Sequence, residues 1–276
     1  MVKIHLISFA SPNVSGKTVS RFAAQAKRAG VFATINVFNV KALSREFRKK
    51  HRTLLRRNVR GFGFWIWKPQ LILQALRSVP EGDWVLYADI GCHISPEKHS
   101  ALDYFVKTAL GSEVPLLGFR LEDNDVQWSK LKLRNLFKEA LSLEEMEQGQ
   151  IAATVLLVQN SRNAVDFVTE WNALGESDHG LIDDTTATLD EDETFIEHRH
   201  DQSTLSLLGK QYKVAALPAE WTEGRRGPIE VRRDRDPSLT SLLFSPADLF
   251  RVLRERRKAT QNWAYRLARD LQLIKK

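Results

Sequence analysis

Short apolar runs of strand length alternate along this chain with longer segments of helical spacing, and this alternation restricts the possible folds most. The predicted strands are 3–9, 34–40, 84–88, 114–119, 151–158 and 212–216, and the predicted helices are 17–29, 69–76, 95–110, 161–174 and 201–208. Strands separated by helices are typical of an α/β fold whose helices flank a mostly parallel or mixed central sheet. Ligands of such sheets bind beyond the carboxyl ends of the strands, so the residues that follow each strand are the first candidates for a site.

The composition is that of an ordinary globular protein. The chain has 276 residues, of which 43% are hydrophobic and 27% charged, which excludes disorder, collagen and coiled coil. It contains neither the run of about 18 apolar residues that a membrane-spanning helix needs nor the apolar core of a signal peptide. The single cysteine, Cys92, allows no internal disulfide and no cysteine-based zinc site. We expect a cytoplasmic protein with one domain at 1–245 and a helical appendage at 246–276.

Positive charge dominates the sequence. The net charge is +7 and the pI about 9.5, which indicates an anionic partner such as a nucleotide, a nucleic acid or an acidic lipid surface. The segment 41–60 is strongly basic, whereas 176–201 is acidic. Beyond Leu249 apolar and basic residues recur at helical spacing, which predicts a basic amphipathic helix. That helix either packs on the domain or lies at the anionic inner face of a membrane, and both interpretations remain open.

Gly16-Lys17-Thr18, between the first predicted strand and the first helix, resembles the end of a phosphate-binding loop. The first glycine of such a loop would fall at Ser11, and Pro12 lacks a backbone N–H for phosphate. We therefore expect Ser15 to cap the helix, and a P-loop nucleotide kinase is the weaker alternative.

Asp89-Ile90-Gly91 directly follows the strand 84–88. An aspartate at this position can hold a divalent cation against a nucleoside diphosphate, and Gly91 lets the backbone approach a ligand closely. The same residues also form an ordinary turn, in which the aspartate bonds to nearby backbone. On these residues alone, the turn is favoured.

The segment 198–203 opens the last predicted helix. Asp201 is a candidate N-cap, worth about 1 kcal/mol. Asp201 and Gln202 can instead hydrogen-bond the hydroxyls of a sugar, because their side chains supply acceptors and donors. His198 and His200 are metal-ligand types, but their spacing of two suits a strand or loop better than one helix face.

Residues 60–69 are unusually rich in aromatic side chains. Faces of Trp and Phe stack on bases and on the apolar faces of sugars, and Arg60 and Lys68 suit phosphate. The alternative is an aromatic cluster that seals the helix beginning at Pro69, and we expect this for most of the rings.

Together, the segments 60–69, 82–92 and 198–203 resemble a family of bacterial glycosyltransferases of the GT-A type, associated with lipopolysaccharide and capsule synthesis. The resemblance runs from about residue 3 to residue 218, with further likeness at 150–152 and Trp171. It implies a single Rossmann-like GT-A domain that binds a nucleotide-sugar, with a UDP-sugar favoured. The implied reaction is transfer of a hexosyl group to a hydroxyl of a surface-polysaccharide or lipid-linked acceptor.

The resemblance also implies roles for single residues. Asp89 matches the first aspartate of the family's metal-binding motif, which implies Mn or Mg, whereas Gly91 stands where the wider superfamily has the second aspartate. Asp201 and Gln202 match the pair that retaining enzymes place at the donor sugar, with Gln202 near the anomeric carbon. The residues implied in donor binding are Phe9, Ala10, Arg60, Lys68, Asp89, Gly91 and His200, with Phe9 and Ala10 at the nucleoside and Arg60 or Lys68 offsetting the diphosphate charge.

Two questions remain open: which residue would act as the general base, and whether the chain is instead a nucleic-acid-binding module. Loop carboxylates would serve as base if the enzyme inverts; they are Glu122, Asp123, Asp125, Asp183 and Asp184. Basic segments interleaved with aromatic residues suggest a nucleic-acid-binding module. No named nucleic-acid motif is present, and the acidic run 190–193 opposes a uniform phosphate footprint, so we expect no nucleic-acid partner.

Overall fold

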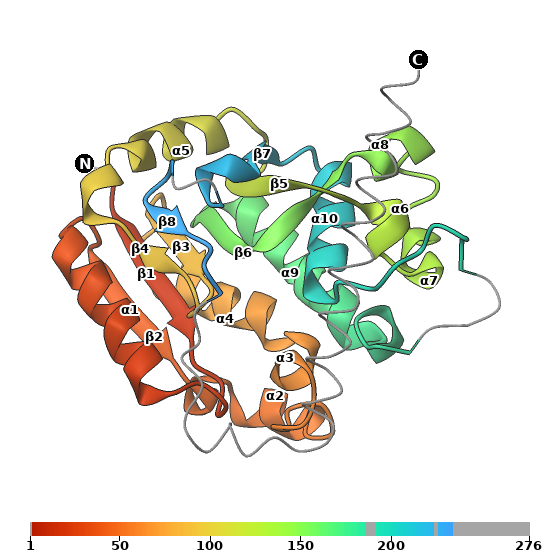
Figure 1. Ribbon diagram of the computed structural model, residues 1–276, viewed down its shortest axis with the longest axis horizontal. Helices are drawn as coiled ribbons and strands as arrows, with labels where there is room; N and C mark the ends of the chain where they lie inside the picture. The colour runs from red at the N-terminus through yellow and green to blue at the C-terminus, as the bar shows by residue number, and fades with distance from the viewer. Residues whose placement is uncertain (1, 186–190, 224–225, 234–276) are drawn as a thin grey trace, which may run out of the picture. The chain divides into compact units, whose positions relative to one another are not determined.

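The computed structural model describes residues 2–185, 191–223 and 226–233 (Figure 1). Within these residues, one sheet has the strand order β2-β1-β3-β6-β5-β7. Its strands are β1 (Ile4–Phe9), β2 (Thr34–Phe38), β3 (Trp84–Ala88), β5 (Leu116–Asn124), β6 (Gly149–Gln159) and β7 (Ala215–Pro218). Only β6 is antiparallel to its neighbours, β3 and β5. The other five strands therefore run in one direction, which confirms the predicted α/β fold with a mixed central sheet.

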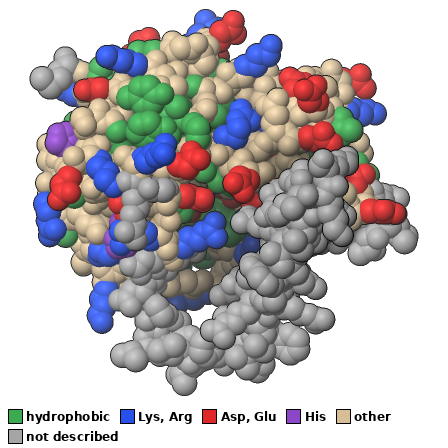
Figure 2. Space-filling model, turned by 45° about the horizontal axis from the view of Figure 1, so that its top comes forward, with side chains coloured by type: hydrophobic (Ala, Val, Ile, Leu, Met, Phe, Trp, Pro, Cys, Tyr) green, Lys and Arg blue, Asp and Glu red, His purple; other side chains and the backbone are tan. Residues whose placement is uncertain are grey.

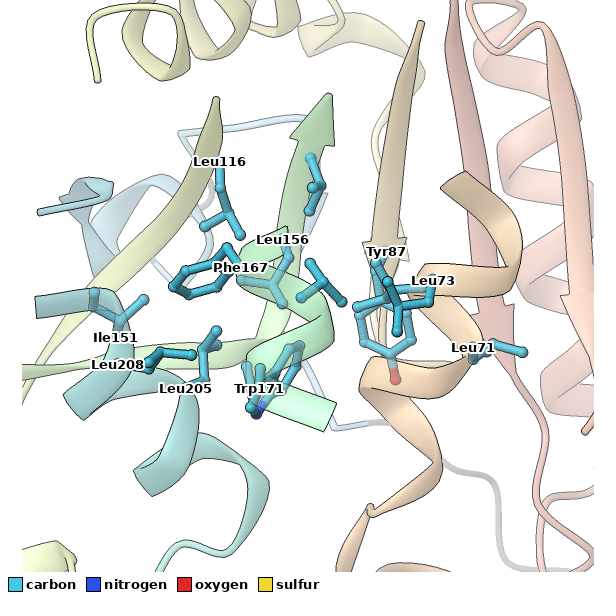
Figure 3. Packing of buried hydrophobic residues seen from close by; sticks show 14 of the residues in the cluster. Leu71, Leu73, Tyr87, Leu116, Ile151, Leu156, Phe167, Trp171, Leu205 and Leu208 are labelled. Carbon is cyan, nitrogen blue, oxygen red and sulfur yellow. The ribbon is translucent and has the colours of Figure 1, made fainter. Parts of the chain in front are cut away.

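Successive residues of the strands point into two separate cores, as the period of two in a strand requires. Val85 and Tyr87 of β3 belong to one core, whereas Trp84 and Leu86 belong to the other. The first core lies under α4 (Trp67–Leu76), α9 (Arg162–Ser177) and α10 (Asp201–Gln211). Figure 3 shows Leu71 and Leu73 of α4, Phe167 and Trp171 of α9, and Leu205 and Leu208 of α10 packed with Tyr87, Leu116, Ile151 and Leu156 of the strands.

The opposite face of the sheet is covered by α1 (Gly16–Ala29) and α5 (Ala101–Ala109). Phe22 of α1 and Phe105 of α5 are fully buried there. A two-stranded sheet of β4 (His93–Ile94) and β8 (Ile229–Glu230) adds Ile94 and Ile229 to the same core. The described domain therefore has three layers, with helices on both faces of the sheet.

Several short elements were not predicted. They are the helices α2 (Arg45–Lys50), α3 (Gly61–Phe64), α6 (Asp125–Trp128), α7 (Leu131–Arg134) and α8 (Leu143–Glu147), and the 3₁₀ turns Val40–Ala42, His179–Leu181 and Ala219–Trp221. Such elements span too few residues for a helical hydrophobic period to be visible in the sequence. The predicted helix 95–110 is accordingly split into a 3₁₀ turn at Pro96–Lys98 and α5.

The predicted helices 17–29, 161–174 and 201–208 are each followed by a glycine as the expected helix stop, which is correct for the first and wrong for the other two. Gly30 ends α1 in the left-handed conformation, with φ of 68°, and its N–H donates to the carbonyl of Lys27. Gly175 and Gly209, in contrast, lie inside α9 and α10. A Cβ on Gly209 would lie 2.9 Å from the side chain of Ile151, so this glycine permits close packing of α10 on β6 instead of ending the helix.

Among the described residues, no helix combines the length and the apolar character needed to span a membrane. The predicted appendage 246–276 lies outside the described residues, so the division at 245 and the basic amphipathic helix stay predictions.

Candidate functional site

A buried lysine joins the two aspartates that the sequence singled out. Lys68, in the first turn of α4, is 2% exposed. Its Nζ lies 2.7 Å from Oδ2 of Asp201, at the start of α10, and 3.5 Å from Oδ1 of Asp89, just after β3. It also donates to the backbone carbonyl of Ala153 on β6, at 3.0 Å. Four elements thus meet at one cationic group near the carboxyl end of β3, the edge of the sheet where ligands were expected.

Asp89 takes part in a turn and in the cluster at the same time. The N–H of Cys92 donates to the backbone carbonyl of Asp89 at 2.8 Å, which closes the predicted turn around Gly91. The Asp89 side chain accepts the hydroxyl of Tyr87 at 2.5 Å and faces Lys68. Arg21 of α1 supports the turn by donating to the carbonyls of Ile90 and Cys92.

The capping prediction for Asp201 is wrong. The residue at the cap position of α10 is His200, and no side chain caps this helix. Asp201 is the first helical residue and is 6% exposed, because its carboxylate turns to Lys68. Its backbone carbonyl accepts from Nε1 of Trp171 at 3.2 Å. The geometry therefore places the Asp201 carboxylate in the charge cluster with Lys68, while the backbone N–H of Gln202 also hydrogen-bonds to it.

Burial shapes the charges of this cluster. It raises the pKa of Asp201 to about 6, although Lys68 pulls that pKa downward. Burial by itself lowers the pKa of Lys68, but the attraction of Asp201 and Asp89 prevails and the pKa of the ammonium is raised. Burial and the negative charge of Asp89 raise the pKa of Tyr87 well above its usual value. At neutral pH the cluster therefore holds one ammonium between two carboxylates, next to a protonated phenol.

The aromatic segment before α4 forms a left-handed turn. The φ angles of residues 61–65 are 60, 54, 99, 53 and 58°. Three of these residues, Phe62, Phe64 and Trp65, carry side chains for which this conformation costs about 1–2 kcal/mol each. The turn is held by a bond from Nε1 of Trp67 to the carbonyl of Gly61, at 3.0 Å. Backbone strain of this kind collects at functional sites.

The rings of this turn support the residue next to Asp201. The ring centroids of Phe64 and Trp65 lie 5.2 and 5.4 Å from that of His200, which itself has a φ of 57°. Nδ1 of His200 donates to the carbonyl of Ile182 at 2.7 Å. Burial, and then the positive charge of Arg60, lower the pKa of His200 to about 4. His200 is therefore neutral at pH 7, and its ring positions the start of α10.

We expect Gly61→Ala to destabilise the fold by about 2 kcal/mol or more, because residues with side chains avoid positive φ and the added Cβ would lie 2.3 Å from the Trp65 ring. Gly16→Ala is the matched control, since no atom lies within 4 Å of the place that its Cβ would take and its φ is ordinary. Urea unfolding of both variants measures the difference. Equal stability of the two would show that the left-handed turn is not rigidly held.

The remaining predicted donor-binding residues occupy different environments. Phe9 is 3% exposed and stacks on Trp67, with ring centroids 4.0 Å apart. Ala10 is half-buried, and its backbone N–H donates to the carbonyl of Phe38. Arg60 is 35% exposed and donates to Glu197 at 2.6 Å. Lys68 and Arg60 thus already have carboxylate partners, and their roles at a diphosphate stay predictions.

Gln202 belongs to a buried polar network that the sequence did not reveal. Its Nε2 donates to Oε1 of Gln150 at 2.8 Å, and Nε2 of Gln150 donates to Oδ1 of Asp125 at 2.9 Å. Lys210 completes the network with its Nζ 2.7 Å from Oδ2 of Asp125. Asp125 is fully buried in this network, and its use as a general base stays a prediction. The likeness noted at 150–152 was the only sequence signal for Gln150.

Three of the other candidate bases are held by cations. Asp183 lies 2.6 Å from Lys130, Asp123 lies 3.3 Å from Arg199, and Asp184 lies 3.5 Å from Arg60. Glu122 is exposed. Asp183, Asp123 and Asp184 therefore already have cationic partners, and the choice of a base for an inverting reaction stays a prediction.

The described residues do not fit a protein-built metal site. They contain no group of three or more His, Cys, Asp or Glu side chains that could hold a metal ion. His198 uses both ring nitrogens, one toward the carbonyl of Leu181 at 2.9 Å and one toward the N–H of Lys130 at 3.3 Å. The ammonium of Lys68 lies between the two carboxylates that would otherwise share a cation.

Two further sequence interpretations have structural outcomes. Oγ of Ser15 accepts from the N–H of Thr18 and caps α1, which confirms the capping interpretation of the phosphate-loop-like segment.

The basic segment is exposed at Arg45, Arg48, Lys49, Lys50, Arg52, Arg56 and Arg57. In the sequence, this segment directly precedes Arg60 and the left-handed turn at 61–65.

Solved structures of similar architecture include three glycosyltransferases. The apo form of the glycosyltransferase GlyE of Streptococcus pneumoniae TIGR4 aligns with 80% of this chain and 46% of its own, at 15% identity and a TM-score of 0.37. A glycosyltransferase involved in the glycosylation of the major capsid of PBCV-1 aligns with 83% and 92%, at 9% identity and 0.46. The galactosyltransferase LgtC, in complex with donor and acceptor sugar analogs, aligns with 79% and 73%, at 12% identity and 0.39.

No protein-family model matches the sequence, and no curated protein matches it. The chain spans less than half the length of the GlyE chain. At these identities and TM-scores the likeness carries no argument about the reaction, which has to be argued from the site.

Proposed function

We propose that the chain is a glycosyltransferase that moves a sugar from a nucleotide-sugar to a hydroxyl group. The observation that carries the proposal is the meeting of Asp89, Lys68 and Asp201 at the carboxyl edge of the sheet, with Gln202 in the next position of α10. A sugar presents many hydroxyls, and a buried cluster of carboxylates and amides supplies matching acceptors and donors. The resemblance in sequence concerns these same residues.

In the proposed reaction, the bond from the anomeric carbon to the phosphate oxygen breaks, and its electron pair leaves with the nucleoside diphosphate. The acceptor hydroxyl oxygen forms the new bond to that carbon, and its proton passes to the departing diphosphate oxygen. Asp201 accepts hydrogen bonds from donor hydroxyls while Lys68 holds its carboxylate in place. The amide of Gln202 stabilises positive charge that develops on the sugar ring. Retention of configuration, a hexosyl donor and a UDP nucleotide are the specific forms that we propose.

Because the described residues do not fit a metal site, no step is assigned to a cation. We therefore expect turnover to persist in EDTA, since Lys68 supplies the positive charge between the carboxylates. The measurement is the initial rate of transfer in EDTA, with added Mg²⁺ or Mn²⁺ in parallel. Loss of the rate in EDTA and its return with Mn²⁺ would contradict this assignment and support the cation that the sequence resemblance implies.

The proposed partners are a nucleotide-sugar and a surface-polysaccharide or lipid-linked acceptor. The exposed basic segment 45–57 provides positive charge for an anionic acceptor, and the tail beyond Leu249 is proposed to bind an anionic membrane at its cytoplasmic face.

A nucleic-acid module is not favoured: on the face in Figure 2, blue and red side chains are interspersed around a hydrophobic patch, with no uniform basic surface.

A panel of nucleotide-sugars tests the proposal through thermal stabilisation, because a ligand that binds only the folded state raises the melting temperature. We expect one donor to raise it and single-stranded oligonucleotides to leave it unchanged. At a concentration of 100 times the dissociation constant, the gain is about 2.7 kcal/mol. Stabilisation by oligonucleotides, with none by any nucleotide-sugar, would favour the nucleic-acid alternative instead.

A further inference from the structure

A chain of hydrogen bonds leads from a buried ion pair to the side chain of Gln202. The pair is Asp125 and Lys210, with Nζ of Lys210 2.7 Å from Oδ2 of the carboxylate. Two hydroxyls also donate to this carboxylate, Ser206 to Oδ2 at 2.8 Å and Ser129 to Oδ1 at 2.9 Å. An ionised carboxylate only accepts hydrogen bonds, so every group that touches Asp125 must present a donor.

This requirement fixes the orientation of the Gln150 amide. Gln150 is fully buried, and its Nε2 lies 2.9 Å from Oδ1 of Asp125. The same nitrogen lies 3.1 Å from Oγ of Ser129, whose proton already goes to Asp125, and 3.4 Å from the carbonyl of Trp128. If the amide were turned over, its oxygen would face these acceptors without a proton between them, which is costly in a buried site. Gln150 must therefore direct its Oε1 toward Gln202.

The orientation of Gln150 in turn fixes that of Gln202. Since Oε1 of Gln150 is an acceptor, Gln202 meets it with its Nε2, at 2.8 Å. The carbonyl oxygen of Gln202 has no hydrogen-bond partner among the described residues. Gln202 is only partly buried, so this oxygen is left for a ligand.

We infer that Gln150 is a positioning residue that, anchored on the Asp125–Lys210 pair, sets the Gln202 amide with its carbonyl oxygen and not its NH₂ group toward the donor sugar. The inference rests on the proposed function. An amide oxygen carries partial negative charge, which suits the positive charge that develops at the anomeric carbon and ring oxygen as the leaving group departs. The opposite orientation would present N–H groups and oppose that charge.

A double-mutant cycle on turnover tests the relay. Gln150→Met keeps the size of the side chain but removes its hydrogen bonds, so the Gln202 amide becomes free to turn. We expect kcat to fall by about tenfold with the donor KM nearly unchanged, because the lost interaction belongs to the transition state. In a protein that already carries Gln202→Ala, adding Gln150→Met should not lower kcat further. The effects of substituting two residues that act as a unit do not add up. Gln211→Met, at the exposed end of α10, is the control.

A kcat of Gln150→Met equal to that of the wild type overturns the inference. The inference is also overturned if Gln150→Met lowers kcat as much in the Gln202→Ala protein as it does in the wild type. That result would indicate a purely structural role for Gln150. If Gln150→Met does not fold, exchange of the Gln202 side-chain NH₂ protons with water decides, measured by NMR on the wild-type protein without donor. Slow exchange supports the donated bond to Gln150, and exchange as fast as that of Gln211 overturns it.

The NH₂ measurement also separates this inference from the proposed function. Protected NH₂ protons in a protein that transfers no sugar would defeat the proposed function and leave the amide orientation intact. Transfer that depends on Gln202 but not on Gln150 would defeat the relay alone.

Discussion

Lys68→Met should lower the free energy of unfolding by about 3–5 kcal/mol, the typical cost of breaking a buried ion pair by removing one partner. The methionine fits the space of the lysine stem but leaves two carboxylates without a counter-charge, and Asp201 is almost fully buried. Turnover should also be lost, because the unpaired carboxylates repel each other and the start of α10 shifts. Urea unfolding and the rate of sugar transfer measure the two effects.

The matched control is Lys107→Met, on the exposed side of α5, which should change stability by about 0.5 kcal/mol or less. The loss in Lys68→Met should be smaller at pH 5 than at pH 8, because protonation removes the uncompensated negative charge. A stability loss in Lys68→Met no greater than that of the control, at both pH values, would contradict the charge cluster.

Asp201→Asn should lower kcat by about 100-fold, a typical loss for a group that acts on the transition state, while the protein stays folded. The asparagine keeps the shape but loses the charge that Lys68 balances and accepts hydrogen bonds less strongly than a carboxylate does. Asp103→Asn, an exposed first-turn aspartate of α5, controls for effects on a helix start. Near-normal turnover in Asp201→Asn would remove Asp201 from the site.

Asp201 also predicts a pH dependence. Its pKa of about 6 in the fold lies above the ordinary 3.8, so the folded state binds this proton more tightly than the unfolded chain does. Ionisation of Asp201 between about pH 4 and pH 6 therefore lowers the free energy of unfolding as the pH rises, and Asp201→Asn should flatten that part of the profile. Turnover of the wild type should fall below about pH 6, where the carboxylate is neutral.

The strands and the longer helices were predictable because their hydrophobic periods are long enough to see. β3 and the body of α1 follow the sequence pattern closely. The α/β alternation predicted a site at the carboxyl edge of the sheet, where Asp89, Lys68 and Asp201 meet. Helix ends were less predictable, since Gly209 signals a helix stop in sequence but serves close packing on Ile151 in the fold.

The organisation of the site depends on tertiary contacts that no local pattern contains. Asp201 stands at a position typical of an N-cap in the sequence, yet its carboxylate forms an ion pair with Lys68, which is distant in the sequence. Lys68 itself suited phosphate in the sequence and is buried in the fold. The left-handed turn at 61–65 had a partial signal, because Gly61 and Gly63 tolerate positive φ, but three residues with side chains share that conformation. Gln150 and Tyr87 were missed because buried polar groups acquire their roles from partners on other elements.

The proposal that Asp201 and Gln202 act on a nucleotide-sugar is tested most directly by the turnover of a bound donor by matched variants of α10. The wild type, Gln202→Ala and Gln211→Ala would each be given the stabilising nucleotide-sugar with an acceptor or with water, and release of the nucleoside diphosphate would be followed. We predict that Gln202→Ala lowers kcat by about 100-fold with little change in KM, while Gln211→Ala matches the wild type. Equal release by all three proteins, or none by the wild type with any donor, would contradict the account.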